Sequence, residues 1–364
     1  MIELSKEMKT GILINSLDSK QDRFKFPGID SIPYGPQIPL KNYLLDLVSD
    51  SGEKESSVYL KKVEGFIQEV WAEIVTNNWR TLRIRKLVPE KLGVHHIMLY
   101  SYKSGKKAIS VQNLYKLLIL WKEYCQKTDR DIQKKWDEIY ESDFVFSVHK
   151  GLQPTKLPKY LTPKLSYLVG WICGDGHMTD YGNHYLIKIS EKSLDELYLL
   201  RSLFKDLFGI DVPIFQIYEG GQAIQFGNKP IFRFLTRVLK VKVGEVPGFV
   251  KNLDPINKKH FLIGILDSEG SVDSSYLESR IIIHQASSKF LEEIIDLFKD
   301  IDIRFTGPYR HETKLGIWYH IQIRKKADIS KFIKEISSCH IDKFQKIKIL
   351  EKKLYAHGYC YNSA

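Results

Sequence analysis

The C-terminal part of the chain contains an internal repeat, and this repeat restricts the possible folds more than any other feature. Leu203-Phe204-Lys205-Asp206 recurs as Leu297-Phe298-Lys299-Asp300, at a spacing of 94 residues. The same spacing, without a gap, relates Leu168 to Leu262, Gly170 to Gly264, Gly176 to Gly270, Ile189 to Ile283, Ser193 to Ser287 and Leu197 to Leu291. A repeat of this length predicts two copies of one supersecondary unit that pack against each other.

Each copy predicts the order αββαββα and therefore an α+β fold. A short apolar helix ends in a glycine, and an amphipathic helix follows, with apolar side chains at helical spacing over residues 194–207 and 290–301. We expect strands at residues 185–190, 214–218 and 223–226 in the first copy and at 280–284 and 318–323 in the second, with closing helices at 231–238 and 329–336.

The composition suggests a division of the whole chain into five parts. Residues 151–163 contain three prolines and two lysines, which is typical of an inter-domain linker. We therefore expect five parts: an N-terminal region whose role the sequence does not indicate (1–79), a mainly helical domain (80–150), the linker (151–163), the first repeat (164–257) and the second repeat (258–356).

The helical domain contains a segment with the pattern of two helices joined by a tight turn. Leu92-Gly93-Val94 marks the break between the helices, and Ser104-Gly105-Lys106 ends the second one. This segment resembles helix-turn-helix domains of the Cro/repressor type, although Pro89 lies where that family has a helix-compatible residue. From Arg80 to Lys127 there are 11 basic residues against 2 acidic ones. We expect DNA contacts from His95, His96, Lys103, Lys106 and Lys107; the alternative is a helical hairpin with a solvated basic face.

Overall charge and hydrophobicity narrow the class of protein. Lys and Arg outnumber Asp and Glu by 55 to 44, and the resulting net charge of +11 suits a polyanionic partner. The apolar runs are too short to span a bilayer, and the N-terminal residues are charged, so we expect a cytoplasmic protein with no membrane contact. The four cysteines have no metal-ligand or disulfide spacing.

The two repeated apolar helices contain the residues that could bind a metal ion or take part in catalysis. They read Leu168-Val-Gly170-Trp-Ile-Cys-Gly174-Asp175-Gly176 and Leu262-Ile-Gly264-Ile-Leu-Asp-Ser268-Glu269-Gly270. The small residues one turn apart allow two helix backbones to approach closely, which brings Asp175 and Glu269 together. We expect the glycine after each acid to end the helix in a left-handed conformation. Two adjacent carboxylates predict a divalent cation with oxygen ligands, Mg²⁺ before a softer metal.

Both nonapeptides resemble the signature of the LAGLIDADG homing endonucleases of the single-chain, two-motif type. The resemblance covers about residues 160–356 and implies a saddle of two sheets on a long duplex DNA target, with a metal-dependent double-strand cut. It implies that Asp175 and Glu269, with the carbonyl groups of Gly174 and Ser268, hold Mg²⁺, with Mn²⁺ able to substitute. A monomer with an internal pseudo-twofold axis follows from the two motifs in one chain.

The resemblance also implies a basic residue near the metals, and Lys192 matches that position. Its equivalent in the second copy is Ala286, so the roles are not symmetric, and Gln285 is the candidate there for orienting a water. Asp267 is expected to be a structural partner. Residues expected to contact bases or phosphates are Lys188, Gln225, Lys229, Arg280, His311, Gln322, Arg324 and Lys326.

Two alternatives share the same fold. A LAGLIDADG-type protein can bind nucleic acid without cutting it, as a transcription regulator of the WhiA type does, or assist splicing as an RNA maturase. Retention of both Asp175 and Glu269 favours the endonuclease. We expect a free-standing protein rather than an intein, because Met1 replaces the nucleophile of an intein and Tyr361-Asn362 replaces its final His-Asn pair.

Overall fold

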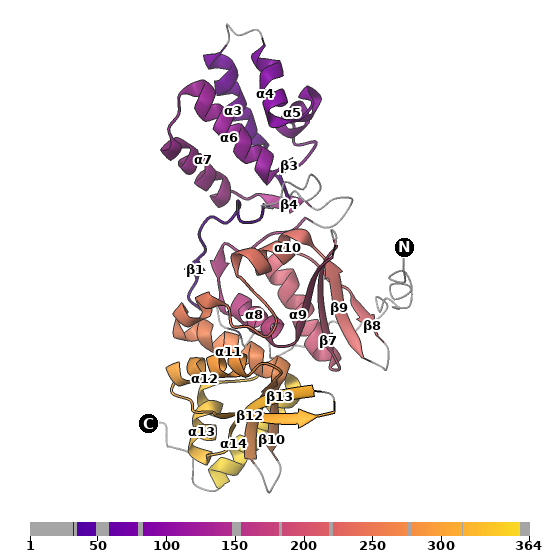
Figure 1. The fold of residues 1–364 in the computed structure, drawn as a ribbon, viewed down its shortest axis with the longest axis vertical. Helices are drawn as coiled ribbons and strands as arrows, with labels where there is room; N and C mark the ends of the chain where they lie inside the picture. Colours follow the sequence, from indigo (N-terminus) through magenta and orange to yellow (C-terminus); the bar gives the residue numbers. More distant parts are fainter. Residues whose placement is uncertain are drawn as a thin grey trace.

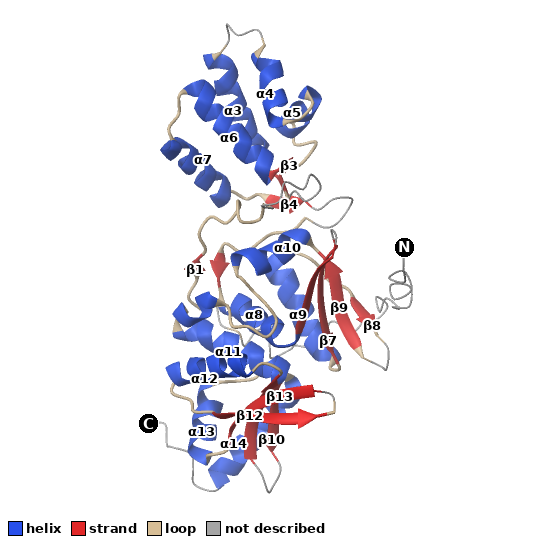
Figure 2. Cartoon of the chain, viewed as in Figure 1, coloured by secondary structure: helices blue, strands red, loops and turns tan. Residues whose placement is uncertain are grey.

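The computed structural model describes residues 32, 35–48, 58–78, 83–147, 154–181, 184–217, 221–274, 279–314 and 316–356. A helical domain, the first repeat and the second repeat follow one another along the longest axis of the molecule (Figure 1). Figure 2 shows that the first unit is mainly helical, whereas each repeat combines helices with a sheet. The predicted α+β class, with two similar halves after a helical domain, is confirmed.

The first repeat has the predicted αββαββα order. It consists of α8 (Pro163–Asp175), β6 (Gly176–Tyr181), β7 (His184–Glu191), α9 (Leu194–Phe208), β8 (Ile214–Gln216), β9 (Gln222–Gly227) and α10 (Lys229–Arg233), which continues as the π-helix η3 (Phe234–Val238). Its strands lie in the order β6-β7-β9-β8, and every neighbouring pair is antiparallel. Residue 218, expected in a strand, lies outside the described residues.

The second repeat reproduces this order and sheet topology. It consists of α11 (Pro255–Glu269), β10 (Gly270–Ser274), β11 (Ser279–Gln285), α12 (Ser288–Asp300), β12 (Thr306–Thr313), β13 (Gly316–Ile323) and α13 (Lys326–Glu335). Its strand order, β10-β11-β13-β12, matches that of the first sheet. The short 3-10 helix η4 (Gly248–Asn252) precedes α11, and an additional helix, α14 (Ile341–Ala356), follows the repeat. Matched serines begin the amphipathic helices: the Ser193 side chain accepts from the Glu196 N–H, and the Ser287 side chain from the Phe290 N–H.

The helices α8 and α11 pack directly against each other, and glycine makes this contact possible. A Cβ atom on Gly170 would lie 2.1 Å from the Phe261 carbonyl oxygen, and one on Gly264 would lie 2.2 Å from the Tyr167 carbonyl oxygen. A Cβ atom on Gly174 would lie 2.0 Å from the Ser268 hydroxyl. The predicted close approach of the two helix backbones is therefore confirmed, and it places the two helix C-termini side by side.

The glycine that follows each acid has a different role from the expected one. Gly176 has φ −76° and Gly270 has φ −83°, so the predicted left-handed helix end is wrong. Each helix passes straight into a strand without a turn. The glycine is needed because a Cβ atom would lie 2.6 Å from the Ile172 carbonyl oxygen at Gly176, and 2.3 Å from the Leu266 carbonyl oxygen at Gly270.

The N-terminal unit is a helical domain with a small sheet. Its helices are α3 (Glu64–Asn77), α4 (Ile84–Leu92), α5 (His96–Lys103), α6 (Val111–Cys125) and α7 (Asp129–Glu141), and its sheet is β2 (Tyr59–Lys61) between β3 (Ile109–Ser110) and β4 (Val145–Ser147). The two helices expected around Gly93 are present as α4 and α5, with Gly93 at φ 70°. Helix α4 contains Pro89 and runs through it. DNA binding by this helix pair stays a prediction.

The limits of the helical domain differ from the expected ones. Helix α3 packs against α5 and α6, so residues 58–78 belong to the helical domain and not to a separate N-terminal region. In the expected linker, residues 151–153 lie outside the described residues, while β5 (Tyr160–Leu161) pairs with β1 (Ile38–Pro39). Apolar side chains from all three units form one continuous core. In the described ranges, no helix combines the length and the apolar surface that crossing a bilayer requires.

Substituting Gly170 with valine tests the helix contact. Because the new side chain meets backbone atoms of α11 that cannot move aside, we expect a loss of about 3 kcal/mol in the free energy of unfolding. Urea unfolding followed by circular dichroism measures it. Gly65→Ala in α3 is the control, since no atom lies within 4 Å of its Cβ position. Equal stability of the two variants would contradict the contact.

Candidate functional site

Asp175 and Glu269 lie at the adjoining C-terminal ends of α8 and α11. A Cβ atom on Gly174 would lie 2.9 Å from Cγ of Glu269, so the Glu269 side chain reaches the end of the opposite helix. Asp175 keeps an exposed surface, whereas Glu269 is half-buried. The structure thus brings together the two acids that the sequence singled out, one from each half.

The environment of these acids favours their protonated forms. The pKa of Glu269 is raised to about 7, first by burial and then by the charge of Asp175. The pKa of Asp175 is raised to about 6, by burial and by the charge of Glu191. Two carboxyl groups with raised pKa values, close together in a partly dry site, release their protons when a cation binds between them.

Gln285 contacts both halves of the site. Its Nε2 donates to Oε1 of Glu269 at 3.0 Å and to the Gly174 carbonyl oxygen at 3.3 Å. Its Oε1 accepts from the Ala286 N–H at 2.6 Å. The amide therefore spans a carboxylate of the second half and a helix-end carbonyl of the first.

Sequence reasoning missed Glu191, the residue at the same repeat position as Gln285. Glu191 ends β7 as Gln285 ends β11, and its Oε1 accepts from the Lys192 N–H at 2.6 Å. Both strand ends thus have the same local geometry, with one polar side chain beside each acid. The spacing of 94 residues could have identified Glu191 from Gln285. The expected basic residue Lys192 is exposed at the next position.

Lys343 on α14 is the second residue that sequence reasoning missed. Its Nζ donates to the carbonyl oxygens of Leu266, at 3.0 Å, and of Asp267, in the last turn of α11. A cation at this end of a helix is favoured by the helix dipole. The charge of Lys343 opposes the rise in the pKa of both Asp175 and Glu269, and burial lowers the pKa of Lys343 itself. Lys343 lies within the expected bounds of the second repeat, 258–356, but on the additional helix α14 that follows its αββαββα elements. The residue 94 positions earlier is Phe249, so the comparison of the two copies could not reveal Lys343.

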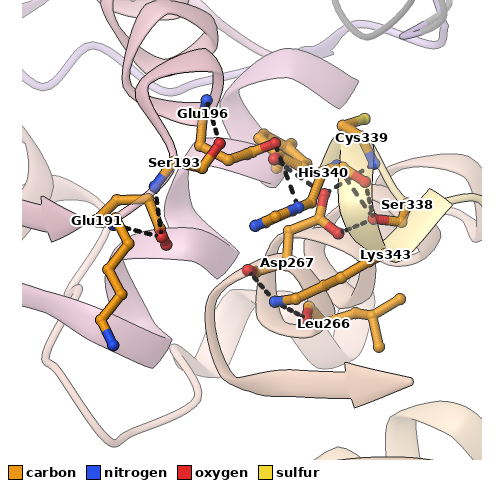
Figure 3. A network of polar contacts seen from close by, with 11 residues as sticks. Glu191, Ser193, Glu196, Leu266, Asp267, Ser338, Cys339, His340 and Lys343 are labelled. Atoms are coloured by element: carbon orange, nitrogen blue, oxygen red, sulfur yellow. Dashed lines mark hydrogen bonds and ion pairs between the residues drawn. The ribbon is translucent and has the colours of Figure 1, made fainter. Parts of the chain in front are cut away.

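Asp267 is at the centre of a buried network that joins both halves to the segment before α14 (Figure 3). Its Oδ2 accepts from the Tyr167 hydroxyl at 3.0 Å and from the Cys339 N–H at 2.8 Å, while Oδ1 accepts from the Ser338 hydroxyl. The side chain is fully buried, and burial raises its pKa. These bonds agree with the structural role expected for Asp267.

A second buried pair in Figure 3 extends the network to α9. Burial raises the pKa of Glu196 to about 9, and the Ile341 N–H donates to this side chain. His340 Nδ1 lies 3.8 Å from Oε1 of Glu196, and burial lowers the pKa of His340. Both groups are therefore neutral near pH 7, as expected for a pair removed from water. The network positions α14, and with it Lys343.

The donor set suits a hard divalent cation. Two carboxylates and the main-chain carbonyls of Gly174 and Ser268 are oxygen ligands, which Mg²⁺ and Mn²⁺ accept. Gln285 shows that the Glu269 carboxylate and the Gly174 carbonyl face a common point. Over the part of the chain that the structure describes, no group of three or more His, Cys, Asp or Glu side chains is arranged as a metal site. Main-chain carbonyls or water are needed to complete the coordination.

A comparison with protein families matches the second half of this arrangement. Residues 257–337 match the family model described as a LAGLIDADG-like domain. The second repeat therefore resembles a LAGLIDADG-like domain over most of its length. The match begins in α11 and ends just after α13, so it includes Glu269 and Gln285 and excludes Lys343.

Comparisons with individual proteins are more distant. The chain is 25% identical over 304 residues to a curated glutamine–fructose-6-phosphate aminotransferase [isomerizing] of Methanocaldococcus jannaschii; the match covers 80% of this chain but 26% of that protein. The chain therefore spans about a quarter of the length of this relative.

Two solved structures resemble parts of this chain at low sequence identity. I-DmoI in complex with DNA and Ca is 19% identical with a TM-score of 0.39, over 52% of this chain and 97% of that one. Full-length DUF199/WhiA from Thermatoga maritima is 18% identical with a TM-score of 0.40, and the match covers 55% of this chain and 62% of that one. At these values the likeness carries no argument about what this chain binds or cuts.

The residues expected to contact DNA on the sheet of the first repeat lie on one face. Lys188 alternates along β7 with the buried Ile187 and Ile189, and it pairs across the strands with Gln225. Both side chains are half-buried on the face opposite the core. Lys229 lies beyond the strands, at the start of α10, with its Nζ 5.0 Å from the centre of the Tyr185 ring.

The residues expected on the second sheet are more dispersed. Arg280 is engaged by Asp273 at 3.5 Å, and Gln322 pairs across the strands with Ile282. Arg324 and Lys326 are exposed beyond the end of β13.

His311 belongs to an aromatic cluster on the second sheet that the sequence reasoning did not recognise. Its ring stacks on Trp318 at 4.3 Å between centroids, and its Nε2 lies 2.9 Å from Nδ1 of His320. His284 completes the cluster and, with Trp318, lines a hollow that also contains Glu269 and Gln285. The alternation of strand residues could have revealed this cluster, because all four rings lie on one face of β11, β12 and β13.

In the helical domain, the expected DNA-contacting residues lie at both ends of α5. His95 is the N-cap of this helix, and its Nδ1 accepts from the Ile97 N–H at 3.4 Å. His96, Lys106 and Lys107 are exposed, and Lys103 is half-buried with its Nζ 5.5 Å from the centre of the Trp71 ring.

The acid pair predicts a pH-dependent cost in stability for the metal-free protein. Since the folded-state pKa of Glu269 is raised, its contribution to stability falls as the pH rises from about 4.5 to 7. We expect Glu269→Gln to stabilise the protein in EDTA by about 1 kcal/mol at pH 8 and by less at pH 5. Urea unfolding at both pH values measures this. Glu292→Gln, at an exposed site on α12, is the control, and a loss of stability in Glu269→Gln at pH 8 would refute the prediction.

Proposed function

We propose that this protein is a site-specific, metal-dependent endonuclease that makes double-strand breaks in duplex DNA. The observation that carries the proposal is the pair Asp175 and Glu269, one from each pseudo-equivalent helix, held together by a glycine-dependent backbone contact. An ordinary helix interface does not require an acid at the same helix end in both copies. Cutting two strands requires an acid near each scissile phosphate, and the two pseudo-equivalent helices would provide one acid each.

Asp175, Glu269 and the carbonyls of Gly174 and Ser268 are the groups that would hold Mg²⁺ or Mn²⁺. Bound there, a divalent ion lowers the pKa of water and neutralises charge on the leaving oxygen during phosphodiester hydrolysis. The raised pKa values of both acids support this role. Burial is the main cause in each case, followed by the charge of Glu191 at Asp175 and the charge of Asp175 at Glu269, and a bound cation would offset the cost of ionising both groups.

Other groups of the chain would position water and the substrate. Gln285 keeps Glu269 oriented toward the end of α8, and Glu191 stands beside Asp175 in the first half. Lys343 holds the last turn of α11 and offsets the negative charge of both acids. Exposed Lys192, at the end of β7, is free to reach a phosphate in the first half, as is Lys188 on the open sheet face.

The deciding experiment separates cutting from binding. Wild type, Asp175→Asn and Glu269→Gln are incubated with a randomised duplex library in Mg²⁺ or in EDTA, and new DNA ends are sequenced. We expect Mg²⁺-dependent double-strand breaks at one recurring sequence with wild type alone. Both variants keep the shape of the side chain and remove its charge, so we expect them to bind that sequence without cutting it.

A DNA-binding regulator that does not cut is the second candidate, and one observation favours it. Lys343 is a built-in cation that already offsets the charge of Asp175 and Glu269, so the acids can persist in a protein that never binds metal. If all three proteins enrich the same uncut sequence, the endonuclease proposal fails and the regulator remains.

The role of Lys343 in cutting has its own test. Lys343→Met removes the charge at similar length, and we expect cleavage to slow by roughly a hundredfold, because a fixed cation near the reacting centre is lost. DNA affinity measured in EDTA should stay within about twofold of wild type, since Lys343 lies beneath the helix ends and not on a sheet face. Lys352→Met, at an exposed site on α14, is the matched control. Cleavage by Lys343→Met at the wild-type rate would exclude the role.

A further inference from the structure

The segment from Gly35 to Val48, here called the N-terminal strap, contacts all three units of the molecule. At its start, the Asn257 side chain on α11 donates to the Pro36 carbonyl oxygen at 3.1 Å. In the middle, β1 pairs with β5 beside the first repeat, and Asn42 donates to Asp137 of α7 at 3.0 Å. The strap therefore links the helical domain to the repeats in addition to the chain connection at residues 148–163, with which it also pairs through β1 and β5.

Tyr43 is the central contact of the strap. Its ring lies 5.3 Å from Tyr140 of the helical domain and 5.2 Å from Phe234 of the first repeat, both edge to face. Its hydroxyl donates to the Pro158 carbonyl oxygen at 2.9 Å, and the residue is only 2% exposed. A buried aromatic side chain between two units resists their relative motion, because separating them exposes its whole surface to water.

Polar contacts fix the end of the strap and a second connection. Arg233, which is 2% exposed, donates to the Leu47 carbonyl oxygen at 2.7 Å. Phe146 of β4 forms a backbone bridge with Thr155, whose hydroxyl accepts from Asn228 at 2.9 Å. Two segments of the chain and the buried groups between them therefore dock the helical domain on the first repeat.

Helices α4 and α5 lie on the same side of the molecule as the strands of both sheets in the view of Figure 1. The exposed Arg85 and Lys86 on α4 contribute positive charge there. Burial, and after it the charge of Arg85, lowers the pKa of Lys103, so these two cations lie near each other. Lys106 and Lys107 are exposed at the end of α5. Between the cations, Ile97 is 59% exposed and Tyr100 is 52% exposed, as suits apolar contact with base edges.

We propose that duplex DNA lying on the two sheets continues onto α4 and α5, which contact its flank at a fixed distance and on a fixed side. This inference rests on the proposed DNA binding by the repeats and adds a third contact region. The docked domain lies in line with the two halves and beyond the first one, so the footprint is asymmetric. A domain on a free linker would instead sample a range of positions along the flank.

Hydroxyl-radical footprinting of the full-length protein in EDTA tests the proposal, on the duplex recovered from the library and extended by about 20 base pairs on each side. We expect one additional protected patch, on one side only, at a constant distance from the centre whatever the flank sequence. Removing that flank should weaken binding by roughly tenfold. Protection that is absent, symmetric or spread along the flank would overturn the proposal.

A matched pair of variants identifies the surface. The double variant Lys106→Ala, Lys107→Ala should remove the flank patch. On the extended duplex it should also reduce the slope of log affinity against log salt concentration by about 1 to 2, but not on the short duplex. Arg130→Ala with Lys134→Ala removes two exposed cations from α7 and should leave the patch in place. If both double variants protect the flank equally, the proposed surface is wrong. A central footprint without a flank patch overturns this inference alone, whereas failure to bind any duplex removes the proposed function as well.

Discussion

The backbone contact between α8 and α11 is the interaction on which the rest of the structure depends. Gly170 and Gly264 allow each helix to touch the main chain of the other, and no side chain could be added at either position without separating them. The distance between the two helix backbones determines whether Asp175 and Glu269 share one site or lie in two separate sites. The same contact sets the relative positions of the two sheets, because each helix passes directly into the first strand of its own sheet through Gly176 or Gly270.

The burial of the two acids, more than their closeness, has an energetic consequence that the surrounding residues moderate. The raised pKa values of Asp175 and Glu269 show that their ionised forms are unfavourable in the protein alone. Lys343 and Gln285 reduce this cost without removing it. A pair of acids whose ionised forms are unfavourable by themselves fits the proposed binding of a cation, and a stable core must support such a pair. The buried network around Asp267 supplies part of that support by connecting α8, α11 and the segment before α14.

The symmetry of the two halves is close in the backbone and incomplete in the side chains. Glu191 and Gln285 share one local geometry, yet one is an acid and the other an amide, so the two halves present different polarity to the shared site. The second sheet carries a stacked cluster of histidines and Trp318, whereas the first presents Lys188 with Gln225. If the proposed DNA binding is correct, such asymmetry suits a target whose two halves differ in sequence. The docked helical domain extends the asymmetry, since it lies beyond the first half only.

The repeat spacing, the small residues and the acids were readable from the sequence because they are local patterns or patterns repeated at a constant distance. They were sufficient for the αββαββα order, the contact through Gly170 and Gly264, and the pairing of Asp175 with Glu269. The sequence could not reveal Lys343, the N-terminal strap or the docking through Tyr43. Each of these depends on side chains that meet across more than seventy residues of chain, and no periodicity records such a meeting. The extended exit at Gly176 was also decided by tertiary structure, because the strand after the helix is held by its neighbour in the sheet, and that pairing overrides the tendency of glycine to end a helix in the left-handed conformation.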